Sequence, residues 1–296
     1  MRTVAIYGLG TVGMTVAANL ISQHQVDELI LLDLDEQRSV AVVNDLKLAY
    51  PFFKRYRVQE WSSLDQAKVL VVACGELNSI QPQLAKQAKL INQVQKQITG
   101  SNFGGIVINL VQPNEATTAF IQQQWQLPPQ RVIGTGTMSD TQALKLAIGE
   151  SLQLASDNVT GYVYGQHDGR LVPAWSTIRV NGRFNDQAIS GHKIDQNKLV
   201  INARLINYYI KRGQAGALTE TRLALELIQA ILEDRQAVYT LAVNQPQFGG
   251  YVSFPVMLGQ NGVQNYLLLK LYSLEEEQLK VARQAIADQE LQLAQS

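Results

Sequence analysis

The sequence predicts an α/β fold in which a doubly wound parallel sheet is followed by an α+β part whose sheet is largely antiparallel. Over about the first 140 residues, short apolar runs alternate with longer amphipathic ones. The apolar runs show little internal alternation, which is typical of strands buried on both faces of a parallel sheet. Beyond that point, alternating runs and a hairpin signal at Asn181-Gly182 replace this rhythm.

The first part is expected to contain six strands joined by helices. The strands are predicted at Val4–Tyr7, Leu29–Asp33, Arg57–Glu60, Val69–Ala73, Ile106–Leu110 and Val132–Ile133. The helices between them are predicted at Val12–Ser22, Glu36–Ala49, Leu84–Ile98 and Glu115–Gln124. This βαβα order predicts a dinucleotide-binding domain over residues 1–140.

The second part, residues 141–296, is expected to be a substrate domain. A helix capped by Ser139-Asp140 is predicted to run to about Glu150. Strands are predicted at Val159–Tyr164, Ser176–Val180, Ala237–Ala242, Gly250–Met257 and Tyr266–Leu271. Further helices are predicted at Gln196–Lys211, at Thr219–Glu233 and from about Leu274 onward.

Composition excludes several classes of function. The chain has 25 basic and 25 acidic residues, and its 17% charged fraction lies below the roughly 25% of ordinary proteins. A net charge of zero gives no overall attraction for nucleic acid or an anionic membrane. The first apolar run is interrupted at Gly8 and no run has the length of a membrane span, so a cytoplasmic protein is expected. With one cysteine, Cys74, and three histidines, neither disulfides nor a metal site are expected.

A glycine-rich turn follows the first predicted strand. Gly8-Leu9-Gly10-Thr11-Val12-Gly13 joins that strand to a helix, which is the spacing of a Rossmann-type dinucleotide site. Its glycines permit a tight turn, close approach of a pyrophosphate, and packing of helix on strand, and the helix amides face the negative charge. Asp33, at the end of the second strand, would accept hydrogen bonds from ribose hydroxyls and repel a 2′-phosphate. NAD is therefore the expected cofactor.

The histidines differ in their surroundings. His24 and His192 lie in polar segments, whereas His167 follows the strand Val159–Tyr164 in a turn. A strand end is a suitable place for an acid/base group. From the pattern alone, a structural loop histidine remains an equal alternative.

Three segments resemble the signature blocks of the lactate/malate dehydrogenase family, above all its L-2-hydroxyisocaproate dehydrogenase branch: Val132–Thr141, Gly161–His167 and Ala174–Val180. The resemblance implies hydride transfer between NAD(H) and a 2-oxo or 2-hydroxy acid. It further implies that His167 donates and accepts the proton, that Asp140 orients it, and that the protein is a homo-oligomer, a dimer or a tetramer. The cofactor residues implied are Gly8, Gly10, Thr11, Val12, Gly13, Asp33, Ala73, Gly75 and Gln112.

The sequence departs from the family pattern around the substrate. The family's carboxylate-binding Arg, three residues after the Asp, is Ala143 here, and its mobile-loop Arg falls near Gln83. In the family's Asn-Pro element after the fifth strand, the position of the Asn is taken by Gln112 here. After His167, the family's usual pair of Gly and a small polar residue is replaced by Asp168-Gly169-Arg170. Two missing charge-assisted hydrogen bonds amount to roughly 3–6 kcal/mol. The substrate pocket is expected at Gln83, Gln112, Ala143 and Ala215, with Arg170, Lys86 or Lys89 as alternative cations.

Three hypotheses follow. The first is an NAD-dependent L-2-hydroxy acid dehydrogenase, of the lactate or 2-hydroxyisocaproate type, with altered carboxylate recognition or an uncharged ketone substrate. The second is a catalytically lapsed NAD-binding relative that acts as a sensor or scaffold. The third is an NAD-dependent glycosidase, which the lack of Cys and His metal ligands disfavours.

Overall fold

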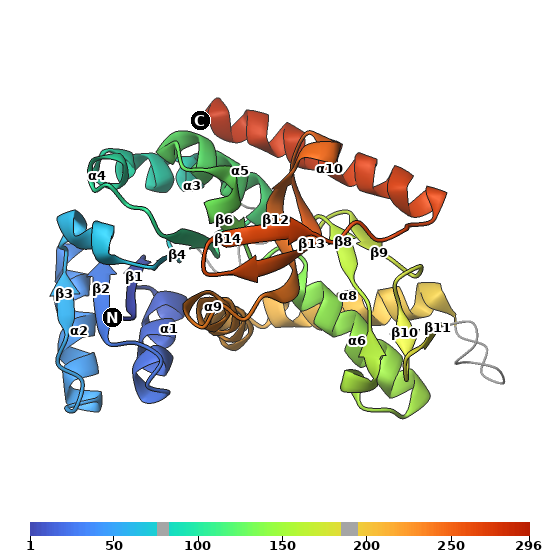
Figure 1. Ribbon diagram of the computed structural model, residues 1–296, viewed down its shortest axis with the longest axis horizontal. Coiled ribbons are helices and arrows are strands. Elements are labelled where there is room, and N and C mark those ends of the chain that lie inside the picture. The colour runs from blue at the N-terminus through green and yellow to red at the C-terminus, as the bar shows by residue number, and fades with distance from the viewer. Residues whose placement is uncertain (76–82, 185–194) are drawn as a thin grey trace.

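The computed structural model describes residues 1–75, 83–184 and 195–296. Two parts lie beside each other, with the N-terminal strands and their helices at one side and the C-terminal elements at the other (Figure 1). The last helix, α10 (Ser273–Ala294), crosses the top of this view from one part toward the other.

The N-terminal part is a parallel sheet with the strand order β3-β2-β1-β4-β5-β6. Every residue of β1, β2, β4 and β5 is buried, which explains why their sequences show no alternation. The strands are β1 (Thr3–Tyr7), β2 (Glu28–Leu32), β3 (Tyr56–Val58), β4 (Val69–Val72), β5 (Ile106–Asn109) and β6 (Val132–Gly134).

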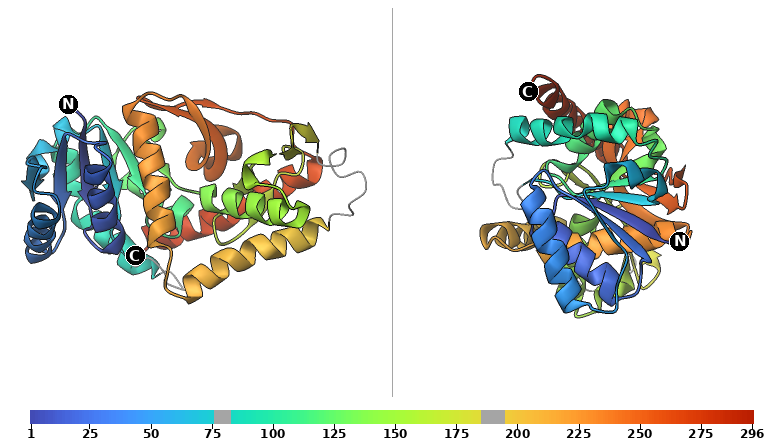
Figure 2. Two further views of the ribbon diagram at one scale, coloured as in Figure 1. Left: turned by 90° about the horizontal axis from the view of Figure 1, so that it is seen from below. Right: turned by 90° about the vertical axis from the view of Figure 1, so that its left-hand side faces the viewer.

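Helices cover both faces of this sheet. In the right-hand view of Figure 2, α1 (Thr11–Ser22) and α2 (Glu36–Ala49) lie below the strands. Above them lie the helices that follow β4 and β5, which are α3 (Leu84–Gln93), α4 (Gln95–Gly100) and α5 (Asn114–Trp125). The predicted doubly wound α/β fold is therefore confirmed.

One predicted helix is not continuous. Residues 84–98 were expected to form a single helix, but the backbone at Val94 leaves helical geometry, with φ −105° and ψ 3°. Val94 is fully buried and β-branched, and such side chains have a lowered helix propensity. The break separates α3 from α4.

The C-terminal part extends the same sheet with antiparallel strands. β12 (Ala237–Gln245) pairs with β6 where Ala242 faces Gly134, and β13, β8 and β9 follow in that order, with β14 on β13. These strands are β13 (Gly250–Gly259), β8 (Val163–Gly165), β9 (Leu171–Pro173) and β14 (Gly262–Tyr266). The expected antiparallel character of this part is confirmed, whereas the division at residue 140 stays a prediction.

Three strand predictions are corrected, two of them by a separate small sheet. The run 159–164 is divided between β7 (Val159–Thr160) in this small sheet and β8 in the large one, because Gly161 turns the chain with φ +131°. The run 176–180 forms only β10 (Arg179–Val180), and β14 already ends at Tyr266. The hairpin turn at Asn181-Gly182 is confirmed, since β10 pairs antiparallel with β11 (Arg183–Phe184).

Three further helices surround the C-terminal strands: α6 (Met138–Leu152), α8 (Gln196–Arg212) and α9 (Ala217–Leu232). Short 3-10 helices occur at Trp61–Gln66, Pro129–Arg131, Ser156–Asn158 and Pro246–Phe248. A second apolar cluster joins α6 to α8, apart from the main core. Among the helices described, none is both long and apolar enough to cross a membrane.

Candidate active site

A pocket opens where the order of the parallel strands reverses. Because the chain winds outward in opposite directions from β1 and β4, the loops after these strands diverge and leave a crevice. This pocket has a volume of about 210 Å³. It is lined by residues that follow β1, β4 and β5: Gly10, Thr11, Val12, Ala73, Cys74, Gly75, Leu110 and Val111.

The glycine turn has the shape that a pyrophosphate needs. Gly8 has φ +97°, and a Cβ on Gly13 would lie 1.9 Å from the carbonyl oxygen of Gly8. A Cβ on Gly10, by contrast, would meet nothing within 4 Å, so open space lies beside the backbone there. Helix α1 has no side-chain cap, and its first amides remain available to an anion. The turn therefore fits the diphosphate of a dinucleotide.

Asp33 stands at the edge of this turn. Its Oδ2 accepts a hydrogen bond from the amide of Leu9 at 2.7 Å, and its Oδ1 accepts one from the amide of Asp35 at 2.9 Å. Each carboxylate oxygen has a further lone pair for a ribose hydroxyl. Asp33 is thus fixed where the fingerprint requires it.

The predicted cofactor residues fall into three groups. Gly10, Thr11, Val12, Ala73 and Gly75 line the pocket. Gly8, Gly13 and Asp33 shape its turn, whereas Gln112 lines a different pocket. Sequence reasoning missed Cys74, Leu110 and Val111, whose only signal is their position at or just beyond a strand end. Burial raises the pKa of the Cys74 thiol to about 12, so this wall of the pocket is uncharged.

His167 and Asp140 meet across two elements. Oδ2 of Asp140 lies 2.6 Å from Nδ1 of His167, and both side chains are almost fully enclosed. Asp140 belongs to the first turn of α6, and His167 follows β8. The hydroxyl of Thr141 accepts a hydrogen bond from the amide of Val163 at 3.0 Å, which fastens α6 to β8. The helix already begins at Met138, so Asp140 serves this pair rather than the predicted cap.

Two further side chains hold this pair in place, and sequence reasoning found neither. Nδ2 of Asn207 donates to Oδ1 of Asp140 at 2.8 Å. Oε1 of the buried Glu115 accepts from the amide of His167 at 2.9 Å and from the hydroxyl of Ser253 at 2.6 Å. Burial raises the pKa of Glu115. The backbone and the orienting carboxylate of His167 are therefore both fixed.

The other nitrogen of His167 also faces a carboxylate. Oδ2 of Asp168 lies 3.0 Å from Nε2, and the same oxygen forms an ion pair with Nζ of Lys211. Burial by itself lowers the pKa of His167, but the negative charges of Asp140 and Asp168 raise it well above its usual value of 6.5. Burial opposes ionisation of Asp168, yet His167 and Lys211 hold its pKa below the usual range. At neutral pH the site therefore holds an imidazolium between two carboxylates.

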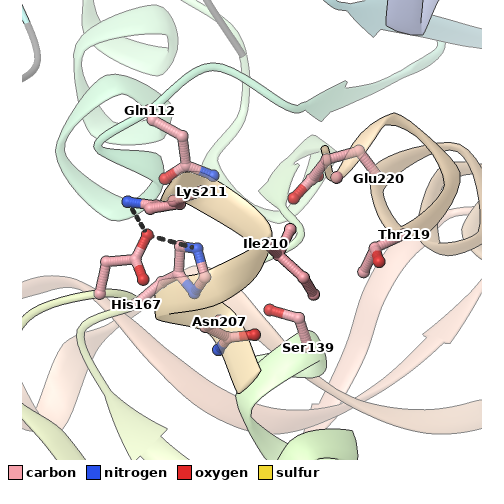
Figure 3. Close-up of a pocket in the computed structure, with 10 residues that line it drawn as sticks. Gln112, Ser139, His167, Asn207, Ile210, Lys211, Thr219 and Glu220 are labelled. Atoms are coloured by element: carbon pink, nitrogen blue, oxygen red, sulfur yellow. Dashed lines mark ion pairs between the residues drawn. The ribbon is translucent and has the colours of Figure 1, made fainter. Parts of the chain in front are cut away.

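The space beside Nε2 is small, about 40 Å³. Figure 3 shows that α8, the start of α9 and the loop before α5 converge on it. The lining residues are Gln112, Ser139, His167, Asp168, Asn207, Ile210, Lys211, Gly216, Thr219 and Glu220. Burial raises the pKa of Glu220 to about 7. Asn207 and Lys211, four residues apart on one face of α8, were detectable only through that spacing.

Of the four residues predicted for the substrate pocket, Gln112 lines it. Ala143 is 3% exposed and packs in the apolar cluster with Leu199 and Ala203 of α8, so the structure assigns it to the core instead. Gln83 is exposed before α3, and Ala215 is exposed although its neighbour Gly216 lines the pocket.

None of the alternative cations predicted from sequence, Arg170, Lys86 or Lys89, lines this pocket. Among the residues described, Lys211 is the lysine or arginine that lines it, beside the imidazolium of His167. In the described part of the chain, no group of three or more His, Cys, Asp or Glu could hold a metal ion.

Comparison with known proteins matches both parts of the chain to one family. Residues 2–134 match the lactate/malate dehydrogenase NAD binding domain, and residues 137–292 match the alpha/beta C-terminal domain of the same family. The chain is 27% identical to an L-lactate dehydrogenase of Pseudothermotoga lettingae, covering 96% of this chain and 94% of the relative. It is 28% identical to an L-lactate dehydrogenase of Fervidobacterium nodosum, covering 96% of each.

Solved structures show the same fold. A lactate dehydrogenase from a Medee basin deep-sea metagenome library superposes with a TM-score of 0.89 at 24% identity, covering 99% of this chain and 100% of that one. The ligand-bound minor L-lactate dehydrogenase of Enterococcus mundtii gives 0.88 at 24% identity, covering 97% of each. With two family domains matched over nearly its whole length and an NAD site that fits, the chain belongs to the lactate/malate dehydrogenase family.

Proposed function

We propose that the protein interconverts a 2-oxo acid and an L-2-hydroxy acid with NAD(H). The observation that carries this proposal is the pair of His167 and Asp140, 2.6 Å apart. Membership of the family and the fit of the glycine turn to NAD support it. The family assignment also leaves no support for the glycosidase alternative.

Each residue of the pair has a distinct task. Bound NADH supplies the hydride that reduces the substrate carbonyl carbon. His167 holds a proton on Nε2 and gives it to the oxygen of that carbonyl as negative charge develops; in the reverse direction Nε2 takes the hydroxyl proton. Asp140 keeps a proton on Nδ1 and stabilises the imidazolium. Asn207 and Glu115 position the pair without touching the reacting atoms.

Recognition of the substrate carboxylate is altered in this proposal. The position three residues after Asp140 carries the uncharged Ala143, which lies in the core. The carboxylate therefore needs a cation from another element. We propose substrates of the lactate type or, following the resemblance to the L-2-hydroxyisocaproate dehydrogenase branch, of the branched-chain type. A homo-oligomeric state and a cytoplasmic location stay predictions.

The test is oxidation of NADH with pyruvate and with branched 2-oxo acids. His167→Asn should lower kcat by about 10²–10⁴-fold, because the proton donor is removed. NADH should bind this variant as it binds the unaltered protein. His24→Asn is the matched control, since His24 is exposed just beyond α1 and should leave turnover unchanged.

One observation favours a second function, that of a catalytically lapsed NAD-binding sensor or scaffold. The carboxylate of Asp168 is paired with Nε2 of His167, the nitrogen that would transfer the proton, and the free space beside Nε2 is only about 40 Å³. If NADH binds but no 2-oxo acid or ketone is reduced faster than by the His167→Asn variant, the enzyme proposal is wrong and this second function stands.

A further inference from the structure

One oxygen atom joins the two cations that line the pocket. Oδ2 of Asp168 contacts Nε2 of His167 at 3.0 Å and forms the ion pair with Nζ of Lys211 (Figure 3). Lys211 comes from the last turn of α8, whereas Asp168 follows β8. The two donors therefore lie within reach of a single carboxylate.

The position of this oxygen conflicts with the proposed reaction unless Asp168 moves. A substrate oxygen that takes the proton of His167 must lie within hydrogen-bond distance of Nε2. Asp168 already holds that place, and a volume of about 40 Å³ admits a water molecule rather than a carboxylic acid. The arrangement is thus a closed form of the site.

Asp168 is able to leave. Its side chain is 25% exposed and that of Lys211 is 30% exposed, whereas Asp140 on the other side of the ring is 2% exposed. Asp168 has φ +56° and is followed by Gly169, in a tight turn at the protein surface. The carboxylate of Asp168 can therefore turn to solvent while the His167–Asp140 pair stays in place.

We propose that Asp168 is an internal substitute for the substrate carboxylate and that Lys211 is the cation that binds that carboxylate. This inference rests on the proposed function. A 2-oxo acid displaces Asp168, its carboxylate pairs with Lys211, and its carbonyl oxygen accepts the hydrogen bond from Nε2. The carboxylate and the carbonyl group of a 2-oxo acid lie on adjacent carbons. In the closed site, Nζ of Lys211 and Nε2 of His167 lie on either side of one oxygen of Asp168, so the two donors are close enough together to bind these two groups.

Charge balance then selects the class of substrate. Exchange of one carboxylate for another leaves Lys211 and the imidazolium of His167 compensated. An uncharged ketone would displace Asp168 and leave the ammonium group without its counter-ion, which carries a desolvation cost. The site therefore prefers 2-oxo acids to uncharged ketones, although no Arg stands at position 143.

The test compares two unreactive ligands of the same size. Oxamate carries a carboxylate beside a carbonyl, and oxamide is its uncharged amide. Binding of each to the full-length protein saturated with NADH is measured by calorimetry, which requires no turnover. Lys211→Met should lower the preference for oxamate over oxamide by about 10- to 100-fold, the effect of one charge-assisted hydrogen bond. Arg212→Met, on the next and exposed residue of α8, is the control and should change neither.

A second variant acts in the opposite direction. Asp168→Asn keeps the size of the side chain but removes the competing charge, so oxamate should bind about 10-fold more tightly. Equal weakening of both ligands in Lys211→Met, weaker oxamate binding in Asp168→Asn, or no binding of oxamate to the unaltered protein would each overturn the inference. If the expected order of affinities appears but NADH is never oxidised, the inference holds and the proposed activity fails.

Discussion

Oδ2 of Asp168 lies 3.0 Å from Nε2 of His167, on the side of the imidazole ring that faces away from Asp140. Both ring nitrogens are thereby paired with carboxylates. The pairing raises the pKa of His167 and keeps the ring protonated, which is the form that reduction of a carbonyl requires. In the proposed reaction, Asp168 must leave this position before a substrate oxygen can reach Nε2.

The first prediction concerns pH. Reduction of a 2-oxo acid needs protonated His167, so the rate should fall as pH rises through the raised pKa of this group. Asp140→Asn removes the negative charge that contributes most to that rise, and the fall should move to lower pH. The measurement is kcat/KM from about pH 5 to 10. Asp45→Asn, at an exposed position of α2, is the control, and an identical profile in Asp140→Asn would contradict the role of the pair.

The second prediction concerns Glu220, whose pKa is raised to about 7 by burial. A carboxyl group with a raised folded-state pKa stabilises the fold fully below its unfolded pKa, near 4.3, and loses this contribution as pH rises through the folded value. The Tm should therefore decline between about pH 4.3 and 7, and Glu220→Gln should lessen the decline. Thermal unfolding over this range is the measurement, with the exposed Glu277→Gln as control. Equal slopes in both variants would show that Glu220 is not buried as described.

The third prediction concerns the position where the family places an arginine. Ala143→Arg forces a long charged side chain into the cluster between α6 and α8, where Leu199 and Ala203 leave it no partner. Burial of an unpaired charge should lower the free energy of unfolding by about 3 kcal/mol or more. Leu146→Arg introduces the same residue at a position of α6 that is 38% exposed, and it should be tolerated. Chemical denaturation measures both; enhanced activity on 2-oxo acids in Ala143→Arg would mean that α8 can move aside.

The fourth prediction concerns the glycine turn. A methyl group on Gly10 meets no protein atom within 4 Å, so Gly10→Ala should leave the Tm of the cofactor-free protein nearly unchanged. The methyl would instead occupy the space beside the backbone that the pyrophosphate approaches, and NADH should bind about 10-fold more weakly. Fluorescence titration with NADH gives the Kd. Gly100→Ala, where a Cβ also meets nothing, is the control. Unaltered affinity in Gly10→Ala would place the diphosphate elsewhere.

Much of the fold could be predicted from local patterns. The strands β1, β2, β4 and β5 are apolar throughout because both faces are covered, and the helices between them have the expected bounds within a few residues. The errors fall where a local pattern competes with tertiary contacts. The buried Val94 interrupts a predicted helix. At Gly161 the chain turns, so that the run 159–164 forms two strands in two different sheets.

The sequence predicted the partner of Nδ1 of His167, which is Asp140, but not the contacts of Nε2 with Asp168 and, through it, Lys211. Gly8, Gly10, Gly13 and Asp33 stand close together in the sequence, and Asp140 and His167 belong to recognisable segments, so sequence alone indicated a cofactor and an acid/base pair. Asn207 and Lys211 belong to no sequence motif. The residues that a helix face contacts are set by how the helix packs in the tertiary structure, which its own sequence does not show. Ala143 was predicted for the pocket because the resembling family has its carboxylate-binding Arg three residues after the Asp; in this structure α8 covers that face of α6.

The sequence by itself determined the order of elements and the dinucleotide fingerprint, since each depends on residues within one strand-turn-helix unit. It singled out His167 only through the resemblance of a contiguous block to the family. Only the tertiary structure decided which charges surround that histidine. Strands β9, β10 and β11 and most of α8 lie between Asp168 and Lys211 in the chain. The two side chains nevertheless form an ion pair, because α8 packs against α6 and its last turn lies beside the turn that follows β8. Electrostatic energy depends on distance in space, and chain order does not determine that distance.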